Sequence, residues 1–308
     1  MEPMFDWLLL AAGIGGAILG GDLFVRGAAR ISARAGISTA FLGATLGALA
    51  TSFPELSVAL VSALEGRPEI SLGDVLGSNV VNISLVLAIG LCFSPVHAPR
   101  ETLRLDYPVA MLVPVVLFLM AWDGQISRND GFFLLGSFAL WMAAAVRLSI
   151  RERHAANTES LQNGTGIPAA LGGLALLGGA GQFIVTAAAS IAGTLGISEF
   201  SVGATLVAFG TSTPELATLL IAKSRKHTAL GLGTILGSNI VNGFLIAGVA
   251  ASISPMEIKR AVVAVSLGAG LATTIVILPN REGWIGRWRG PILLACYAAT
   301  TFLLAAIG

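Results

Sequence analysis

Two glutamates occur deep inside apolar stretches of the 308-residue sequence, and each directly follows a proline. Glu55 closes the segment Thr51-Ser-Phe-Pro-Glu, and Glu215 closes the matching segment Thr211-Ser-Thr-Pro-Glu. A carboxylate is costly to bury in apolar surroundings unless a cation or a hydrogen-bond donor compensates it. The two segments therefore predict a site that uses two negative charges.

A second pattern, G-S-N-x-x-N, also occurs twice. Its serines, Ser78 and Ser238, offer hydroxyls, and its last asparagines, Asn82 and Asn242, offer amide carbonyls. The side-chain atoms that could bind a cation in the two patterns are all oxygens, and neither pattern contains His, Cys or Met. Such a set suits hard cations such as Ca²⁺ and Na⁺ rather than Zn²⁺ or copper, and it suits Mg²⁺ less well because Mg²⁺ demands octahedral geometry.

The prolines of the first pattern, Pro54 and Pro214, predict a break in each helix, because a proline donates no backbone hydrogen bond and clashes with the preceding turn. The break is expected to free backbone carbonyls such as those of Ala48 and Ala208. Freed carbonyls can coordinate cations.

Other interpretations of these residues stay open. The glutamates could form a buried salt bridge, although no Lys or Arg is expected in the middle of a span, or they could be protonated, which keeps a proton-coupled alternative. A single Ser or Thr hydroxyl usually bonds to its own helix one turn back, but repetition at equal offsets favours a functional role. The remaining duplicated residues are expected to support the ligands or to pack the helices: Ser52, Ser212, Asn79 and Asn239.

The composition indicates a membrane protein, since 55% of the residues are hydrophobic and 11% are charged, and the mean hydropathy is +0.84. The formal net charge of +1 gives no basic face for nucleic acid. Cys92 and Cys296 form neither a disulfide framework nor a zinc-binding set. An intramembrane hydrolase would need a nucleophile with a base or paired aspartates, yet all three histidines fall in loops and no Asp is expected in the middle of a span. The sequence therefore predicts neither an enzyme nor a cofactor.

About ten transmembrane helices are expected, because each span needs roughly 20 apolar residues and these runs are too long for barrel strands. The predicted fold is all-α. The spans are expected near residues 7 to 25, 38 to 64, 70 to 94, 105 to 122, 131 to 150, 167 to 190, 200 to 222, 229 to 252, 261 to 279 and 289 to 307.

The spans form an internal repeat. A shift of 160 residues lays residues 43–82 on residues 203–242 without a gap, with nineteen of forty positions identical. Each copy holds about five spans, and an odd number means that the second copy enters the membrane upside down. The expected units are residues 1–150, a linker at 151–166 and an inverted second repeat at 167–308. Inverted repeats are typical of secondary transporters, whose sites lie at the repeat interface near the midplane.

The loop charges predict the orientation, because cytoplasmic loops retain Lys and Arg. With both termini outside, fourteen of the eighteen Lys and Arg residues fall on the cytoplasmic side, together with the linker. These are Arg26, Arg30, Arg34, Arg100, Arg104, Arg147, Arg151, Arg153, Lys223, Arg225, Lys226, Arg281, Arg287 and Arg289.

With its paired T-S-x-P-E and G-S-N-x-x-N motifs, the sequence resembles the sodium/calcium exchanger family of the cation/calcium antiporter superfamily, in its prokaryotic form without a regulatory domain. The resemblance implies electrogenic exchange of three Na⁺ for one Ca²⁺ in a prokaryotic cell membrane, with no protein partner. It places Ca²⁺ between Glu55, Glu215 and the backbone carbonyls of Thr51 and Thr211. Sodium would use two groups that share the glutamates, with Asn82 and Asn242 completing the centre: Ala48, Thr51 and Ser78 on one side, and Ala208, Thr211 and Ser238 on the other.

One departure from the family concerns Asn242, where some prokaryotic relatives and the potassium-dependent branch carry Asp. This weakens any potassium requirement. Proton-coupled relatives tend to carry G-N-x-x-E in place of G-S-N-x-x-N, so the motif favours sodium over protons. A cation channel is a further alternative, since acidic residues also line pores.

Overall fold

The structure is a computed structural model that describes residues 3–66, 68–151, 166–194, 208–258 and 260–307. Most of the predicted linker, and the start of the span expected at residues 200 to 222, lie outside these residues. The described chain is helical, as the apolar runs predict, with four additional two-residue strands.

The first half consists of five helical segments, two of which contain π-helical turns (η1 and η2). They are α1 (Pro3–Ala35); α2 (Thr39–Leu42) with η1 (Gly43–Gly47), α3 (Ala48–Thr51) and α4 (Phe53–Leu64); α5 (Pro68–Val81) with η2 (Asn82–Leu87) and α6 (Ala88–Phe93); α7 (Arg100–Arg104) with α8 (Asp106–Met120) and the 3₁₀ turn η3 (Ala121–Asp123); and α9 (Arg128–Arg151).

The second half repeats this order. Its elements are α10 (Ile167–Thr194); α12 (Ala208–Thr211) with α13 (Thr213–Ser224); α14 (Thr228–Ile240) with the π-helical turn η6 (Val241–Ile246) and α15 (Ala247–Ile253); α16 (Arg260–Val276); and α17 (Arg289–Ile307). Both α3 and α4 recur 160 residues later as α12 and α13.

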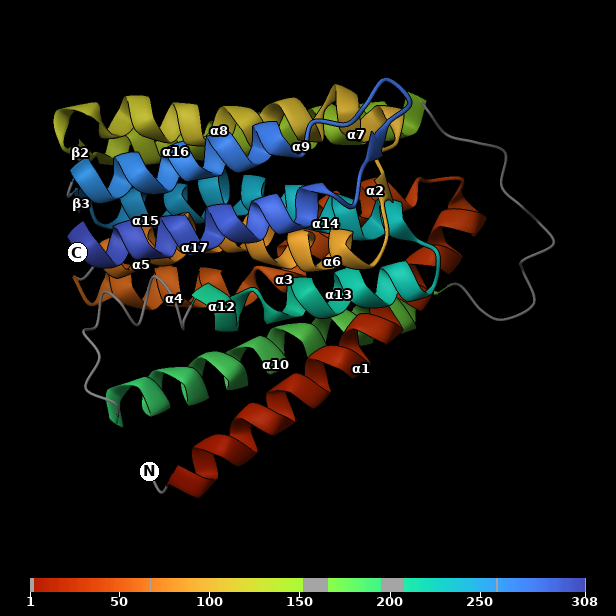
Figure 1. The fold of residues 1–308 in the computed structure, drawn as a ribbon, viewed down its shortest axis with the longest axis horizontal. Coiled ribbons are helices and arrows are strands. Elements are labelled where there is room, and N and C mark those ends of the chain that lie inside the picture. The colour runs from red at the N-terminus through yellow and green to blue at the C-terminus, as the bar shows by residue number, and fades with distance from the viewer. Residues whose placement is uncertain (1–2, 67, 152–165, 195–207, 259, 308) are drawn as a thin grey trace.

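The two halves are inverted relative to each other, as the odd number of spans predicts. In Figure 1, α1 and α10 run in opposite directions below the main bundle, and α4 and α13 extend in opposite directions from the centre. Both termini lie at the same end of the long axis (Figure 1). The fold is an all-α membrane fold of about ten spans in two inverted five-helix repeats.

Short strands join the two halves at their ends. Strand β1 (Val96–His97) pairs antiparallel with β4 (Trp284–Ile285), and β2 (Gln125–Ile126) pairs antiparallel with β3 (Met256–Glu257). Each pair takes one strand from each repeat, so the inverted symmetry extends to the loops.

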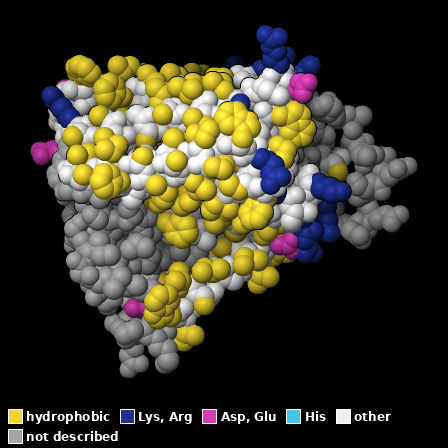
Figure 2. All heavy atoms as spheres, viewed as in Figure 1, with side chains coloured by type: hydrophobic (Ala, Val, Ile, Leu, Met, Phe, Trp, Pro, Cys, Tyr) yellow, Lys and Arg dark blue, Asp and Glu magenta, His cyan; other side chains and the backbone are white. Residues whose placement is uncertain are grey.

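The surface of the bundle matches a membrane environment. Among the described residues, five helices are long and apolar enough to span a membrane, and the bent pair Thr39–Thr51 and Phe53–Leu64 adds a sixth. Figure 2 shows hydrophobic side chains along the flank, with most of the visible Lys and Arg at the end opposite to the termini. This gathering matches the positive side that the sequence predicts, while the side of the membrane stays a prediction.

The helix break lies two residues before the predicted position at Pro54. Helix α3 ends at Thr51, Ser52 is non-helical, and α4 begins at Phe53 with a bend of 43°. Pro54 therefore occupies the first turn of the new helix, where its missing N–H costs nothing. The second repeat is built alike, with Ser212 between α12 and α13.

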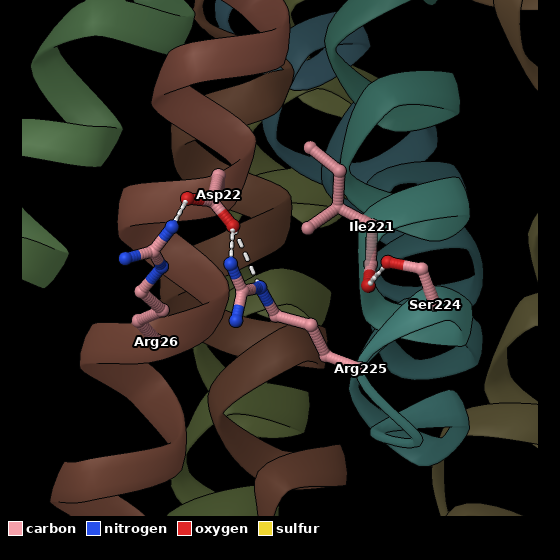
Figure 3. A network of polar contacts seen from close by, with 5 residues as sticks. All are labelled: Asp22, Arg26, Ile221, Ser224 and Arg225. Carbon is pink, nitrogen blue, oxygen red and sulfur yellow. Dashed lines mark hydrogen bonds and ion pairs between the residues drawn. The ribbon is translucent and has the colours of Figure 1, made fainter.

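Helices α1 and α10 pack against each other through glycines, because a Cβ at Gly173 would overlap the backbone of Phe24. The central part of α1 also contacts α13, at Gly21. Asp22 forms ion pairs with Arg26 of its own helix and with Arg225 beyond α13 (Figure 3).

Candidate functional site

The structure brings the ten predicted site residues to the two helix breaks and to the helices that cross them. All of them are 0% exposed. They are Ala48, Thr51 and Glu55 on α3 and α4, Ser78 and Asn82 on α5 and the start of η2, Ala208, Thr211 and Glu215 on α12 and α13, and Ser238 and Asn242 on α14 and η6.

One hydroxyl pair joins Thr51 to Ser238, whose oxygens lie 3.3 Å apart. The Thr51 hydroxyl also lies 3.0 Å from the carbonyl of Gly47, to which it donates. Because the proton points back along the helix, the lone pairs of the oxygen stay available to a cation. Ser238 donates to Oε1 of Glu215 at 3.0 Å, which attaches a carboxylate to this pair.

The second hydroxyl pair joins Ser78 to Thr211 at 3.1 Å. The two pairs therefore form across the repeats, whereas the sodium groups expected from the family resemblance joined Thr51 with Ser78 and Thr211 with Ser238. The hydroxyl contacts cross the repeats because each broken helix faces the crossing helix of the other half, while the expected sodium groups stay a prediction.

The second pair has a carboxylate that symmetry does not predict. The hydroxyls of Ser78 and Thr211 both lie 3.5 Å from Oδ1 of Asp74, and the Thr211 hydroxyl also lies 3.1 Å from the carbonyl of Ala208. Neither oxygen of Glu55 has a hydrogen-bond partner, although the side chain is fully buried.

Asp74 is the site residue that sequence reasoning missed. Asp74 belongs to α5, near the start of the span Ser71–Phe93, and is 1% exposed, so a search for Asp in the middle of the spans passed over it. Its repeat counterpart is Thr234, so a search for duplicated residues discards it. The spacing of four residues between Asp74 and Ser78, which places both on one helix face, is the signal that could have found it.

The backbone carbonyls of Ala48 and Ala208 are not freed as expected. They accept hydrogen bonds from the amides of Ser52 and Ser212 at 3.0 and 3.1 Å. Each helix continues its hydrogen bonding up to the break, because the proline lies two residues further along. The same carbonyls also lie within hydrogen-bond distance of the Thr51 and Thr211 hydroxyls, at 3.4 Å for Ala48 and 3.1 Å for Ala208. Ala48 and Ala208 therefore stay candidate ligands only if a cation replaces one of these bonds.

The asparagines divide into two roles. Asn79 and Asn239 donate to each other's backbone carbonyls at 3.2 and 3.1 Å, which fastens α5 to α14. Asn82 donates to Oδ1 of Asn239 at 3.1 Å, and its own Oδ1 has no partner. Both polar atoms of the Asn242 side chain are also without a partner. Asn79 and Asn239 thus pack the helices, as expected. Asn82 and Asn242 keep amide oxygens that can accept a ligand.

The duplicated serines at the breaks differ. Ser52 donates to Oε1 of Glu215 at 3.4 Å and so reaches across the repeats. The hydroxyl of Ser212 is buried without a partner. Helix α10 covers the breaks closely, since a Cβ at Gly181 would overlap the ring of Pro54 and lie 3.4 Å from Cγ of Pro214.

The site is rich in unpaired acceptors. The atoms without partners are Oε1 and Oε2 of Glu55, Oδ2 of Asp74, Oδ1 of Asn82, Oε2 of Glu215 and Oδ1 of Asn242. Acceptors buried without donors are costly, and a bound cation would compensate them. Among the described residues, no three His, Cys, Asp or Glu side chains lie close enough to hold one metal ion.

Comparison with known proteins agrees with this chemistry. The model of the sodium/calcium exchanger protein family matches residues 5–147 and 166–306, one match for each repeat. The chain is 34% identical over 262 residues to the inner membrane protein YrbG of Escherichia coli, covering 81% of this chain and 80% of that protein. It is 27% identical to the sodium/calcium exchanger MaX1 of Methanosarcina acetivorans, covering 97% and 98%.

A solved structure extends the likeness to three dimensions. The sodium-calcium exchanger NCX_Mj, soaked with Na⁺ and Ca²⁺, superposes with a TM-score of 0.80 at 29% identity, covering 96% of this chain and 97% of that one. The family model covers both halves of the chain. The chain therefore belongs to the sodium/calcium exchanger family.

Proposed function

We propose that this protein is a secondary antiporter that exchanges Na⁺ for Ca²⁺ by alternating access. The observation that carries the proposal is the buried, oxygen-only site at the repeat interface, where several carboxylate oxygens of the described residues have no hydrogen-bond partner. Glu55 interacts electrostatically with both Glu215 and Asp74. Oxygen ligands with several negative charges suit Ca²⁺ and Na⁺.

The inverted repeats supply the alternating access. The same break occurs in two helices that run in opposite directions from the site. A state open to one side then has a counterpart open to the other side with the roles of the repeats exchanged. The 0% exposure of the ten site residues fits a closed stage of that cycle. No cofactor and no protein partner enter this cycle.

Exchange is electrogenic in this proposal, since three Na⁺ carry one charge more than one Ca²⁺. The similarity to an inner membrane protein supports a place in a prokaryotic cell membrane, with both termini outside. A proton-coupled antiporter and a cation channel are the competing functions. The serines at 78 and 238 favour sodium over protons, because hydroxyls offer ligands to a metal ion.

Uptake of ⁴⁵Ca²⁺ into proteoliposomes tests the proposal. Vesicles loaded with Na⁺ and diluted into sodium-free medium are expected to accumulate calcium, while vesicles with equal Na⁺ on both sides are not. A pH gradient imposed without a sodium gradient tests the proton-coupled alternative, which predicts calcium uptake under this condition. Calcium uptake that requires no sodium gradient, no pH gradient and no counter-ion would indicate a channel.

A further inference from the structure

The two halves of the site carry different carboxylates at equivalent hydroxyl pairs. Ser238 and Thr51 are accompanied by Glu215, to which Ser238 donates at 3.0 Å. The inverted symmetry would give Ser78 the same bond to Glu55, yet the carboxylate oxygen within hydrogen-bond distance of Ser78 and Thr211 is Oδ1 of Asp74, at 3.5 Å from both hydroxyls. The site therefore contains a third carboxylate that the repeat does not duplicate.

We propose that Asp74 binds a transported sodium ion together with the hydroxyl oxygens of Ser78 and Thr211, and thereby determines how well sodium competes with calcium. This inference rests on the proposed function for the identity of the ions. It adds a ligand that neither the duplicated motifs nor the family resemblance assigns.

The burial of Asp74 and a carboxylate oxygen without a hydrogen-bond partner support its role as a ligand. The side chain is 1% exposed, and its Oδ2 has no hydrogen-bond partner. Its Oδ1 lies 3.5 Å from the hydroxyl oxygens of both Ser78 and Thr211, which lie 3.1 Å from each other. The single proton of the Thr211 hydroxyl has a closer acceptor in the carbonyl of Ala208, at 3.1 Å, so a lone pair of this oxygen stays available to a cation. These three oxygens carry one negative charge, which balances one monovalent cation. A divalent ion would keep an uncompensated positive charge there, so this position favours Na⁺ over Ca²⁺.

Among the described residues, Thr234, the repeat counterpart of Asp74, has only structural contacts at this position. The hydroxyl of Thr234 donates to the carbonyl of Leu230 at 3.0 Å, in its own helix. It is 0% exposed and lies near Gly47. At this position α14 therefore packs against the first repeat without a carboxylate. The equivalent position of α5 carries the carboxylate of Asp74.

The third carboxylate changes which step of the cycle moves charge. With Glu55, Asp74 and Glu215 ionised, three Na⁺ neutralise the site, while one Ca²⁺ leaves one negative charge. Without Asp74, Ca²⁺ neutralises the two glutamates, and three Na⁺ leave one positive charge. The charge moved in a full cycle is the same in both cases, so Asp74 shifts the voltage dependence between half-cycles without altering the equilibrium.

The test measures cation binding by the purified full-length protein, as the rise in melting temperature with added NaCl or CaCl₂ at constant ionic strength. A ligand that binds only the folded state stabilises it according to its affinity. We expect D74N to raise the half-saturating Na⁺ concentration by about tenfold or more, since ligand charge tunes affinity over decades, and to change that of Ca²⁺ much less. D74E should recover sodium binding, and T234S should match the parent.

An unchanged sodium response in D74N would overturn the inference, as would equal losses for both ions, which a merely structural role predicts. Should D74N fail to give a monodisperse protein, D74T decides, because it introduces the residue that the second repeat already accommodates. The parent must itself be stabilised by Na⁺, otherwise the inference falls. None of these readouts requires transport, so a protein that binds both ions but does not couple their fluxes would refute the proposed function alone.

A second readout uses proteoliposomes clamped at different potentials. Calcium self-exchange without sodium is expected to depend on voltage in the parent and to lose that dependence in D74N. Voltage-independent self-exchange in the parent would contradict a third ionised carboxylate in the calcium-loaded site.

Discussion

The carboxylate of Asp22 in α1 forms an ion pair with the guanidinium of Arg225, which directly follows α13 (Figure 3). The Nε of the same guanidinium donates to Asp22 at 2.6 Å. Next to this pair, a Cβ at Gly21 would lie 3.1 Å from Cδ1 of Ile221. The pair therefore fastens the central part of α1 over the outer half of α13, which leads from the site to the positively charged end.

Breaking this pair should loosen α1 from α13 while the fold persists. Both partners are partly exposed, so the pair contributes about 1 kcal/mol or less, and D22N should populate the separated state by up to about fivefold more. The measurement is the maleimide labelling rate of A217C in a purified variant that lacks Cys92 and Cys296, because Ala217 is 9% exposed and lies under Gly21.

The control for this experiment is R26Q, which removes only the ion pair within α1. It should leave the labelling rate of A217C near that of the parent. Faster labelling in R26Q than in D22N would show that the pair with Arg225 does not hold α1 in place.

Replacing either glutamate by glutamine should abolish calcium exchange and leave a folded protein. The change keeps the shape of the side chain but removes one negative charge from a site whose hold on a divalent ion depends on charge. E55Q and E215Q are compared with E65Q, which removes the same charge at the exposed end of α4. Sodium-driven ⁴⁵Ca²⁺ uptake near the parent rate in either site variant would exclude that glutamate from the site.

The loops after α4 and α13 occupy equivalent places in the repeat and should face opposite sides of the membrane. Single cysteines at Glu65 and Lys226 report this in a background without Cys92 and Cys296, since both positions are exposed. An impermeant maleimide applied to intact cells should label E65C and spare K226C until the cells are permeabilised. The reverse pattern would invert the orientation, with both termini inside.

Much of the fold follows from the sequence because apolar length and duplication are properties of the chain alone. The last predicted span, 289 to 307, coincides with α17. The first helix extends beyond its predicted span, 7 to 25, since α1 continues to Ala35 through Arg26 and Arg30. These arginines extend beyond the apolar run but still form a helix, because a polar helix end needs no lipid.

The site was predicted less completely than the fold. The duplicated residues do meet, but which hydroxyl faces which depends on how the crossing helices pack, and no local pattern contains that information. Asp74 was missed because the search relied on duplication, and the state of the Ala48 carbonyl depends on where the break falls to within one residue.

The most direct test of coupled exchange is the calcium gradient at zero net flux, measured in proteoliposomes clamped at several potentials with fixed sodium gradients and pH. Three Na⁺ per Ca²⁺ predicts a calcium ratio that follows the third power of the sodium ratio. One net charge crossing 100 mV is worth about 2.3 kcal/mol, so the ratio should also change roughly fiftyfold per 100 mV. A gradient that follows voltage but ignores sodium would contradict exchange and indicate a channel, whereas one that follows sodium but ignores voltage would contradict the electrogenic stoichiometry.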